Sequence, residues 1–186
     1  MGKIRIYFDC DGFLLNTIGK AIELAKEGGF IHDTYDGLHE FFLQVNWEDL
    51  IKKAGVLDNA IEKIRLLLQN DDYDIEILTK ISGGEAEIAA KTAFFDVELP
   101  GVDITTVDFD KAKNEVVDPV DAVLIDDEPR NVLKWRAAGG IGILFSKEKC
   151  DLENDIVDDI AKIEYTKGFR ELKEKMNSKN LSKKLF

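Results

Sequence analysis

The sequence contains only two cysteines, Cys10 and Cys150, among its 186 residues. Two cysteines cannot form the disulfide framework that supports small secreted domains. We therefore expect both to be reduced thiols, as in a cytoplasmic protein. Cys10 lies between Asp9 and Asp11, and because their negative charges oppose formation of a thiolate, a nucleophilic role for Cys10 is not expected.

Long apolar runs are also missing from the sequence. The longest charge-free apolar stretch covers residues 137–146, about half the length that a bilayer-spanning helix needs. The short apolar run at residues 4–8 is ended by Asp9, so it does not have the architecture of a secretory signal peptide. We expect no membrane association and predict a cytoplasmic protein.

Basic residues are in deficit, because 25 Lys and Arg stand against 37 Asp and Glu, for a formal net charge of −12. Binding of a nucleic acid polymer needs a basic face that neutralises phosphates, so we expect no such partner. A small phosphorylated substrate is not excluded, since a bound divalent cation can reverse the local field. With 45% hydrophobic residues, the chain can bury a sizeable core, which excludes the disordered and collagen-like classes.

Five short runs rich in β-branched and aromatic residues predict strands. They cover residues 3–8, 74–78, 102–107, 122–125 and 141–145. Each run is too short for a helix, and segments with helical periodicity separate them. This alternation is typical of an α/β fold, with a Rossmann-like, parallel five-stranded sheet that carries helices on both faces.

The interval between the first and second predicted strands is unusually long. Residues 17–73 are helical in pattern throughout, whereas a crossover between parallel strands needs roughly a dozen residues. We interpret residues 17–73 as a small helical cap inserted after the first strand, and residues 1–16 and 74–186 as the core domain. The cap aromatics either stack on a substrate or form the cap's own core; they are Phe30, Tyr35, Phe41, Phe42 and Trp47.

Helical periodicity is also clear elsewhere in the chain. It predicts helices over residues 18–25, 38–45, 57–68, 84–95 and 129–138, and two more between residues 152 and 176. The helix at 129–138 begins with a proline, which suits the first helical position.

Polar side chains follow the predicted strands at their carboxyl ends. Asp9 and Asp11 follow the first, Thr79 and Lys80 the second, residues 108–113 the third, and residues 126–127 the fourth. Ligands bind outside the carboxyl ends of the strands in an open parallel sheet, so we expect these groups to converge. A crowd of carboxylates is costly unless a cation neutralises it, and hard oxygen ligands of this kind suit Mg²⁺.

These residue types are suited to phosphoryl transfer. One carboxylate can attack phosphorus and form an aspartyl-phosphate, while a second, two residues along the chain, exchanges protons with the leaving oxygen and with water. The turn at Gly12 would let Asp11 swing beside Asp9. Thr79 and a lysine can hold the phosphoryl oxygens.

Four segments resemble, in order, the motifs of the haloacid dehalogenase-like superfamily of phosphohydrolases: YFDCDGFLLNT, ILTK, DKAKNE and VLIDDEPRN. The resemblance implies that Asp9 is the nucleophile and Asp11 the general acid/base. It also implies that the Thr79 hydroxyl binds the substrate phosphate together with a lysine. Lys113 fits that lysine best, because residues 113–116 resemble a short helix leading into the fourth strand, and Lys111 is the alternative.

The same resemblance implies a Mg²⁺ site. Its ligands would be Asp9, the backbone carbonyl of Asp11, and Asp127, with Asp126 supporting the site; Asp126 as the direct ligand is the alternative. Lys80, beside Thr79, is a further candidate for binding the substrate phosphate.

Within the superfamily, LIDDEPRN and the small helical cap look most like the 5′(3′)-deoxyribonucleotidases. Phe13 and Lys80 depart from the pattern of that group and are expected to face the substrate. The resemblance implies a Mg²⁺-dependent phosphomonoesterase acting on a small phosphorylated metabolite, such as a (deoxy)nucleoside 5′-monophosphate. The alternatives are a phosphomutase of the same superfamily and a non-catalytic binding protein that retains the fold.

Overall fold

The computed structural model describes residues 3–30 and 38–145. At its centre is a five-stranded sheet, and all of its neighbouring strands are parallel, in the order β3-β2-β1-β4-β5. The strands are β1 (Ile4–Phe8), β2 (Tyr73–Ile81), β3 (Asp103–Asp108), β4 (Ala122–Asp126) and β5 (Ile141–Leu144). The predicted α/β fold with a parallel five-stranded sheet is confirmed.

The second strand is longer than its apolar run predicted. Thr79 and Lys80 were expected to follow β2, but they lie within it, because pairing with β3 continues to Ile81, opposite Asp108. Backbone hydrogen bonds extend the strand through polar residues that an apolar pattern cannot detect. Since successive side chains of a strand point to opposite faces, Thr79 and Lys80 face opposite sides of the sheet.

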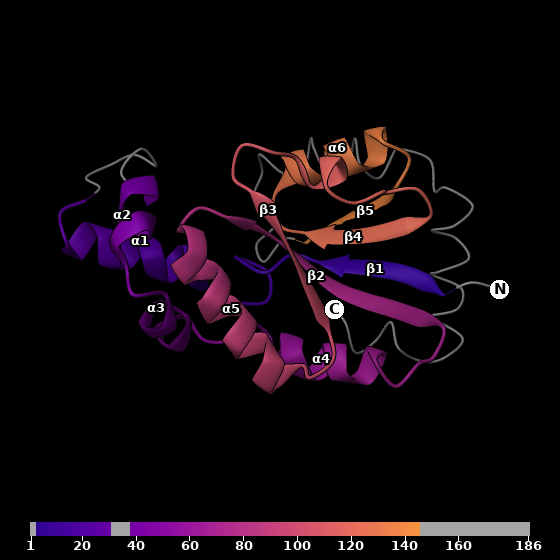
Figure 1. Cartoon of the computed structure of the whole chain (residues 1–186), viewed down its shortest axis with the longest axis horizontal. Helices are drawn as coiled ribbons and strands as arrows, with labels where there is room; N and C mark the ends of the chain where they lie inside the picture. The colour runs from indigo at the N-terminus through magenta and orange to yellow at the C-terminus, as the bar shows by residue number, and fades with distance from the viewer. Residues whose placement is uncertain (1–2, 31–37, 146–186) are drawn as a thin grey trace.

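The helices lie in three places around the sheet (Figure 1). Helices α1, α2 and α3 gather beyond the carboxyl ends of the strands, α4 and α5 cover one face, and α6 covers the other. Their bounds are α1 Thr17–Glu27, α2 Leu38–Gln44, α3 Trp47–Ala54, α4 Ala60–Leu67, α5 Gly84–Glu98 and α6 Pro129–Ala137. Helix α3 was not predicted as a separate element; the side chain of Asn46 caps its first turn by accepting a hydrogen bond from the amide of Asp49.

The cap aromatics pack against one another. Phe41, Phe42 and Trp47 are buried, and the ring centroids of Phe42 and Trp47 lie 5.2 Å apart. Phe30 packs edge-on against Phe41 at 5.4 Å, while Tyr35 lies outside the described residues. For Phe41, Phe42 and Trp47, the structure shows burial in a hydrophobic cluster that continues into the core around the sheet.

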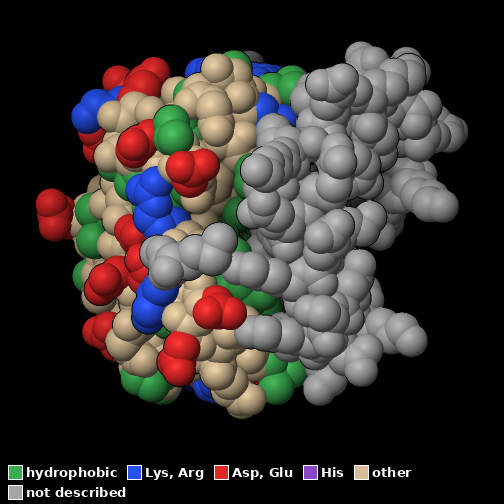
Figure 2. Space-filling view, turned by 90° about the vertical axis from the view of Figure 1, so that its right-hand side faces the viewer, with side chains coloured by type: hydrophobic (Ala, Val, Ile, Leu, Met, Phe, Trp, Pro, Cys, Tyr) green, Lys and Arg blue, Asp and Glu red, His purple; other side chains and the backbone are tan. Residues whose placement is uncertain are grey.

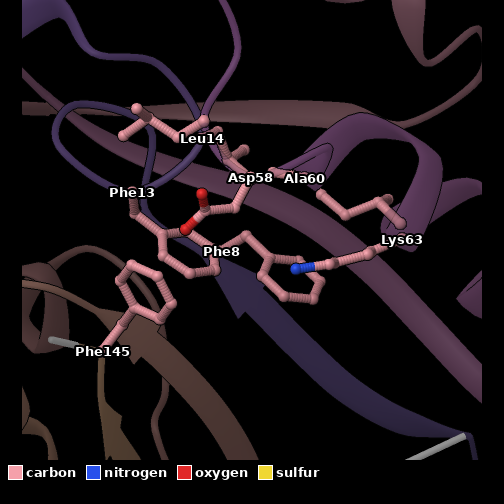
Figure 3. A pocket seen from close by; sticks show the side chains of 9 residues that line it. Phe8, Phe13, Leu14, Asp58, Ala60, Lys63 and Phe145 are labelled. Atoms are coloured by element: carbon pink, nitrogen blue, oxygen red, sulfur yellow. The ribbon is translucent and has the colours of Figure 1, made fainter. Parts of the chain in front are cut away.

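Helix α4 lies beside the sheet rather than beyond its edge. Ala60 and Ile64 of α4 line a pocket together with Phe8 at the end of β1 and with Phe13 and Phe145 (Figure 3). The predicted cap, residues 17–73, therefore contains a bundle at the strand ends and one helix that packs on the core. Its boundaries stay a prediction.

The face where the strands begin is turned to the viewer in Figure 2. Acidic and basic side chains are interspersed over its described part, as on an ordinary solvated surface. No helix among residues 3–30 and 38–145 is both long and apolar enough to cross a membrane. Cys150 and the two helices predicted between residues 152 and 176 lie outside the described residues.

Candidate active site

Strands β1 and β4 bring three carboxylates together at the carboxyl edge of the sheet. The amide of Asp9 donates to the carbonyl of Ile125 at 2.9 Å, which joins the end of β1 to β4. Asp9, Asp126 and Asp127 each offer a carboxylate oxygen, and these oxygens all lie within 4.8 Å of one another. We call these three residues the acidic triad.

The short 3-10 helix η2 (Lys113–Glu115) delivers a lysine to the acidic triad. The ammonium of Lys113 donates to Asp9 Oδ1 at 2.5 Å and to Asp126 Oδ2 at 2.7 Å, and Lys113 is buried. Lys111 instead pairs with Asp108 at 2.6 Å on the exposed surface. Of the two lysines weighed from the sequence, the structure places Lys113 beside Asp9.

The acidic triad lacks enough positive charge among its described neighbours. Burial raises the pKa of Asp9 above its ordinary value, and the Lys113 ammonium only partly opposes this. Burial and the nearby charge of Asp126 raise the pKa of Asp127 to about 7. Burial alone would lower the pKa of Lys113, but Asp9 and Asp126 raise it overall. One ammonium does not balance three carboxylates. A divalent cation such as Mg²⁺ would neutralise the remaining negative charge, and carboxylate oxygens are the ligands that it prefers.

Asp126, the last residue of β4, and Asp127, which follows it, have different environments. Asp126 is fully buried, accepts hydrogen bonds from the side-chain amide of Asn131 and from the amide of Glu128, and ion-pairs with Lys113. Asp127 lies so close to Gly12 that a Cβ there would be 2.1 Å from Asp127 Oδ2. Glycine in the turn after Asp11, where φ is +84°, therefore makes room for the Asp127 carboxylate.

Asp11 does not belong to the acidic triad. Its Oδ1 accepts from the Thr17 hydroxyl at 2.5 Å, and its Oδ2 accepts from the Thr79 hydroxyl at 3.2 Å and from the Lys91 ammonium at 2.5 Å. The turn at Gly12 thus directs this carboxylate toward α1, β2 and α5, rather than into the group formed by Asp9, Asp126 and Asp127.

Lys91 and Glu87 were missed by the sequence reasoning. Both lie on α5, both are buried, and they form an ion pair at 2.6 Å. Together with Asp11, Thr17 and Thr79 we call them the Asp11 cluster. In the structure Glu87 and Lys91 share one buried stripe of α5 with Ala90 and Phe95. A Glu and a Lys four residues apart are typical of an exposed helix surface, so their spacing in the sequence did not indicate burial.

Lys80 and Phe13 lie apart from these clusters. The ammonium of Lys80 donates to the carbonyl of Phe109 at 3.1 Å and lies 5.9 Å from the centroid of that ring. Partial burial and the charges of Lys134 and Lys113 lower the pKa of Lys80. Phe13 stacks on Phe8 at 5.9 Å and meets Phe145 edge-on at 4.8 Å, so its ring belongs to the pocket under α4 (Figure 3).

No protein-family profile and no curated protein matches this chain. Solved structures do match it. An L-2-haloacid dehalogenase from Xanthobacter autotrophicus, with chloropropionic acid covalently bound, is similar over 84% of this chain and 83% of its own, with a TM-score of 0.52 and 12% identity. A haloacid dehalogenase-like hydrolase from Streptococcus pneumoniae is similar over 87% of this chain and 99% of its own, with a TM-score of 0.51 and 16% identity.

A third similar structure is a HAD-hydrolase from Bacillus subtilis bound to magnesium. It matches over 81% of this chain and 90% of its own, with a TM-score of 0.50 and 17% identity. At such low identities the similarity establishes the fold. The chain therefore has the fold of haloacid dehalogenase-like hydrolases, as the four sequence motifs implied.

Proposed function

We propose that this protein is a Mg²⁺-dependent phosphomonoesterase that forms an aspartyl-phosphate on Asp9. The observation that carries the proposal is that Asp9 and Asp11, two residues apart on one short loop, have carboxylates with different partners. Asp9 lies in the acidic triad beside Lys113, whereas Asp11 is bonded to hydroxyls and to a second lysine. Hydrolysis through a phosphoenzyme needs this division between a nucleophile and a proton-transfer group.

The reaction has two displacements at phosphorus. In the first, an Asp9 carboxylate oxygen bonds to phosphorus while the ester P–O bond breaks, and Asp11 gives its proton to the leaving oxygen. In the second, Asp11 takes a proton from water as the water oxygen bonds to phosphorus, and the bond between Asp9 and phosphorus breaks. The products are the alcohol and inorganic phosphate, and Asp9 and Asp11 return to their starting forms.

Other groups of the site would stabilise charge on the phosphoryl oxygens. Lys113 contacts Asp9, so its ammonium lies where a phosphoryl group on Asp9 would need a donor. The Thr79 hydroxyl, which donates a hydrogen bond to Asp11, is the proposed phosphate-binding hydroxyl. Lys80, whose side chain lies on the other side of the sheet from Thr79, remains a proposed contact of the substrate phosphate. Asp9, the Asp11 carbonyl and Asp127 would hold Mg²⁺, with Asp126 in support, and the bound cation would supply charge neutralisation during transfer.

The acidic triad favours phosphate esters over haloacids as substrates. A halide leaves as a stable anion, so its displacement needs neither a proton donor nor a divalent cation. The proposed function assigns proton transfer to Asp11, and three carboxylates of the described site fit a cation; both would be superfluous for halide release. We propose a small phosphorylated metabolite as the substrate, such as a (deoxy)nucleoside 5′-monophosphate, with residues 17–73 selecting it.

Phosphate release from a panel of phosphate esters, measured with Mg²⁺ and with EDTA, tests this function. The panel includes nucleoside 5′- and 3′-monophosphates, sugar phosphates and p-nitrophenyl phosphate, with 2-chloropropionate as the haloacid arm. We expect Mg²⁺-dependent phosphate release that Asp9→Asn abolishes. Chloride release without phosphate release, or full phosphatase activity in EDTA, would contradict the proposal.

A further inference from the structure

Lys91 occupies the centre of the Asp11 cluster. Its side chain is fully buried, and its ammonium lies 2.5 Å from Asp11 Oδ2, 2.6 Å from Glu87 Oε1 and 2.9 Å from the Thr79 hydroxyl oxygen. The Trp47 ring of α3 covers it, with the ring centroid 5.5 Å from the ammonium nitrogen. Residues from α3, α5, β2 and the loop after β1 therefore meet at one ammonium group.

Glu87 holds Lys91 in place independently of Asp11. Its Oε2 accepts the amides of Ser82 and Gly83 at 2.8 and 2.6 Å, in the turn between β2 and α5, while its Oε1 contacts Lys91. The backbone of this turn thus anchors Glu87, and Glu87 in turn anchors Lys91. Glu87 therefore fixes the position of the Lys91 ammonium, and the Asp11 carboxylate forms an ion pair with it.

Stability alone does not account for a buried charged pair on α5. The same stripe of the helix carries Ala90 and Phe95, and well-packed apolar residues at such positions are often as stabilising as a buried ion pair, or more so. We therefore look for a role of the Glu87–Lys91 pair other than stability. Its outermost carboxylate partner is Asp11, whose side chain is 17% exposed, against 0% for Lys91.

Direct binding of substrate by Lys91 does not fit the geometry. An ammonium has three N–H donors, and Asp11, Glu87 and Thr79 lie within 3 Å of it. No donor is left over for a phosphoryl oxygen, and the group has no exposed surface. Any effect of Lys91 on the reaction must pass through the side chains that it holds.

We infer that Lys91 is a positioning residue for Asp11, holding the carboxylate that transfers the proton in line with Thr79 and apart from the acidic triad. This inference rests on the proposed function, because it assigns Lys91 to the proton-transfer half of that site. A displacement of about 1 Å in such a group can cost about 10²-fold in rate. The loss in the rate of phosphoenzyme formation should be selective: large where the leaving oxygen needs a proton, and small for an aryl phosphate.

The test uses the double variant Lys91→Met/Glu87→Gln in the full chain. Removing the ammonium and the Glu87 charge together avoids an unpaired buried carboxylate on α5, which the single variant Lys91→Met would leave. Glu85→Gln, in the exposed first turn of the same helix, and Lys52→Met, on the exposed surface of α3, are the matched controls. Glu87→Gln alone, which keeps the ammonium, should show a weaker form of the same effect.

We expect kcat/KM on an alkyl phosphate, which reports formation of the phosphoenzyme, to fall by about 10²-fold in the double variant, with kcat/KM on p-nitrophenyl phosphate much less affected. Because hydrolysis of the phosphoenzyme also uses Asp11, kcat should fall on both substrates. In an Asp11→Asn background the double variant should cause no further loss, since there is no proton-transferring carboxylate left to position. Both controls should keep wild-type constants. Equal losses of kcat/KM on both substrates, or a full additional loss in the Asp11→Asn background, would overturn the inference.

A crystal structure of the double variant separates this inference from the proposed function. The Asp11 carboxylate should leave the position that it has beside Thr79, whatever reaction the protein catalyses. If the wild-type protein hydrolyses no phosphate ester, the proposed function fails, and the Asp11 position decides the structural claim alone. An Asp11 carboxylate that stays on Thr79 and Thr17 without Lys91 would show that Lys91 does not position it.

Discussion

The acidic triad and the Asp11 cluster begin two residues apart in the chain but balance their charges differently. In the acidic triad, one ammonium contacts two of three carboxylates. In the Asp11 cluster, one ammonium lies between two carboxylates, which also accept hydrogen bonds from two hydroxyls and two backbone amides. The first arrangement leaves carboxylate charge that a proton or a cation could neutralise, while in the second the protein itself supplies donors to both carboxylates.

This difference shows how one loop can supply a reactive carboxylate and an oriented one. A buried carboxylate with too few donors is high in free energy and gains from a cation or a covalent partner. A carboxylate with donors on both oxygens is confined to one geometry. The predictions below test this division, from the largest expected effect to the smallest.

Replacing Asp9, the proposed nucleophile, should have the largest effect. Asp9→Asn removes the anionic oxygen with little change in shape, so phosphate release should fall by several orders of magnitude. The melting temperature should hold or rise, because one of three crowded carboxylates is gone. The matched control is Asp108→Asn at the exposed end of β3, which should retain activity. If Asp9→Asn keeps activity near the wild-type level, Asp9 is not the nucleophile.

Replacing Asp11 should have a smaller effect that depends on the leaving group. Asp11→Asn should slow hydrolysis of alkyl phosphates by about 10²–10⁴-fold, the usual contribution of a general acid/base. An aryl phosphate needs no proton on its leaving oxygen, so a phosphoenzyme on Asp9 should accumulate and be visible by mass spectrometry. Equal losses of kcat/KM on aryl and alkyl phosphates would mean that Asp11 does not protonate the leaving oxygen.

Metal binding should stabilise the protein more at high pH than at low pH. The pKa of Asp127 is raised to about 7, so the stability that Asp127 contributes is present below its unfolded pKa and is lost as the pH rises through about 7. Mg²⁺ should reverse that loss, and protons should compete with it at low pH. The Mg²⁺-induced rise in melting temperature should therefore be larger at pH 8 than at pH 5.5. Asp127→Ala should abolish it, and an unchanged shift in that variant would exclude Asp127 as a ligand.

The smallest effect should come from the turn that separates the two clusters. Gly12→Ala puts a Cβ where Asp127 Oδ2 lies, at 2.1 Å, and forces alanine to a φ of +84°. Gly101→Ala is the matched control, because Gly101 has a φ of +83° and a Cβ there would meet nothing within 4 Å. Both should lose about 1–2 kcal/mol from backbone strain. Only Gly12→Ala should also lose the Mg²⁺ response in a thermal melt; if both keep it, Gly12 is not needed to place Asp127.

Much of the fold followed from local patterns. The runs around Ile6 and Val123 predicted strands, and the spacing of Ile61, Ile64 and Leu67 predicted a helix, because apolar periodicity reflects burial directly. The ends of elements were less predictable. Thr79 and Lys80 fall inside β2 because pairing with β3 continues past the apolar residues. The sequence of β2 alone does not show how far β3 extends beside it.

The candidate site was predictable where residues follow strands. Asp9, Asp126 and Asp127 converge because β1 and β4 are adjacent and parallel. The pattern of strands and helices predicted the parallel sheet, whereas the order of its strands came from the structure. Their roles stay predictions. The choice between Lys111 and Lys113 needed the structure, since both lysines lie near η2 and only the path of the chain turns Lys113 toward Asp9.

The sequence by itself determined the parallel α/β architecture and the set of acidic residues at the strand ends, because both depend on local periodicity and on the order of the motifs. Only the tertiary structure decided that the Asp11 carboxylate meets Thr79 and Lys91, the latter 80 residues along the chain. Contacts of that kind depend on how α5 packs against β2 and on the turn at Gly12. The physical reason is that burial and hydrogen-bond partners belong to the three-dimensional surroundings of a side chain, which its neighbours in the sequence do not specify.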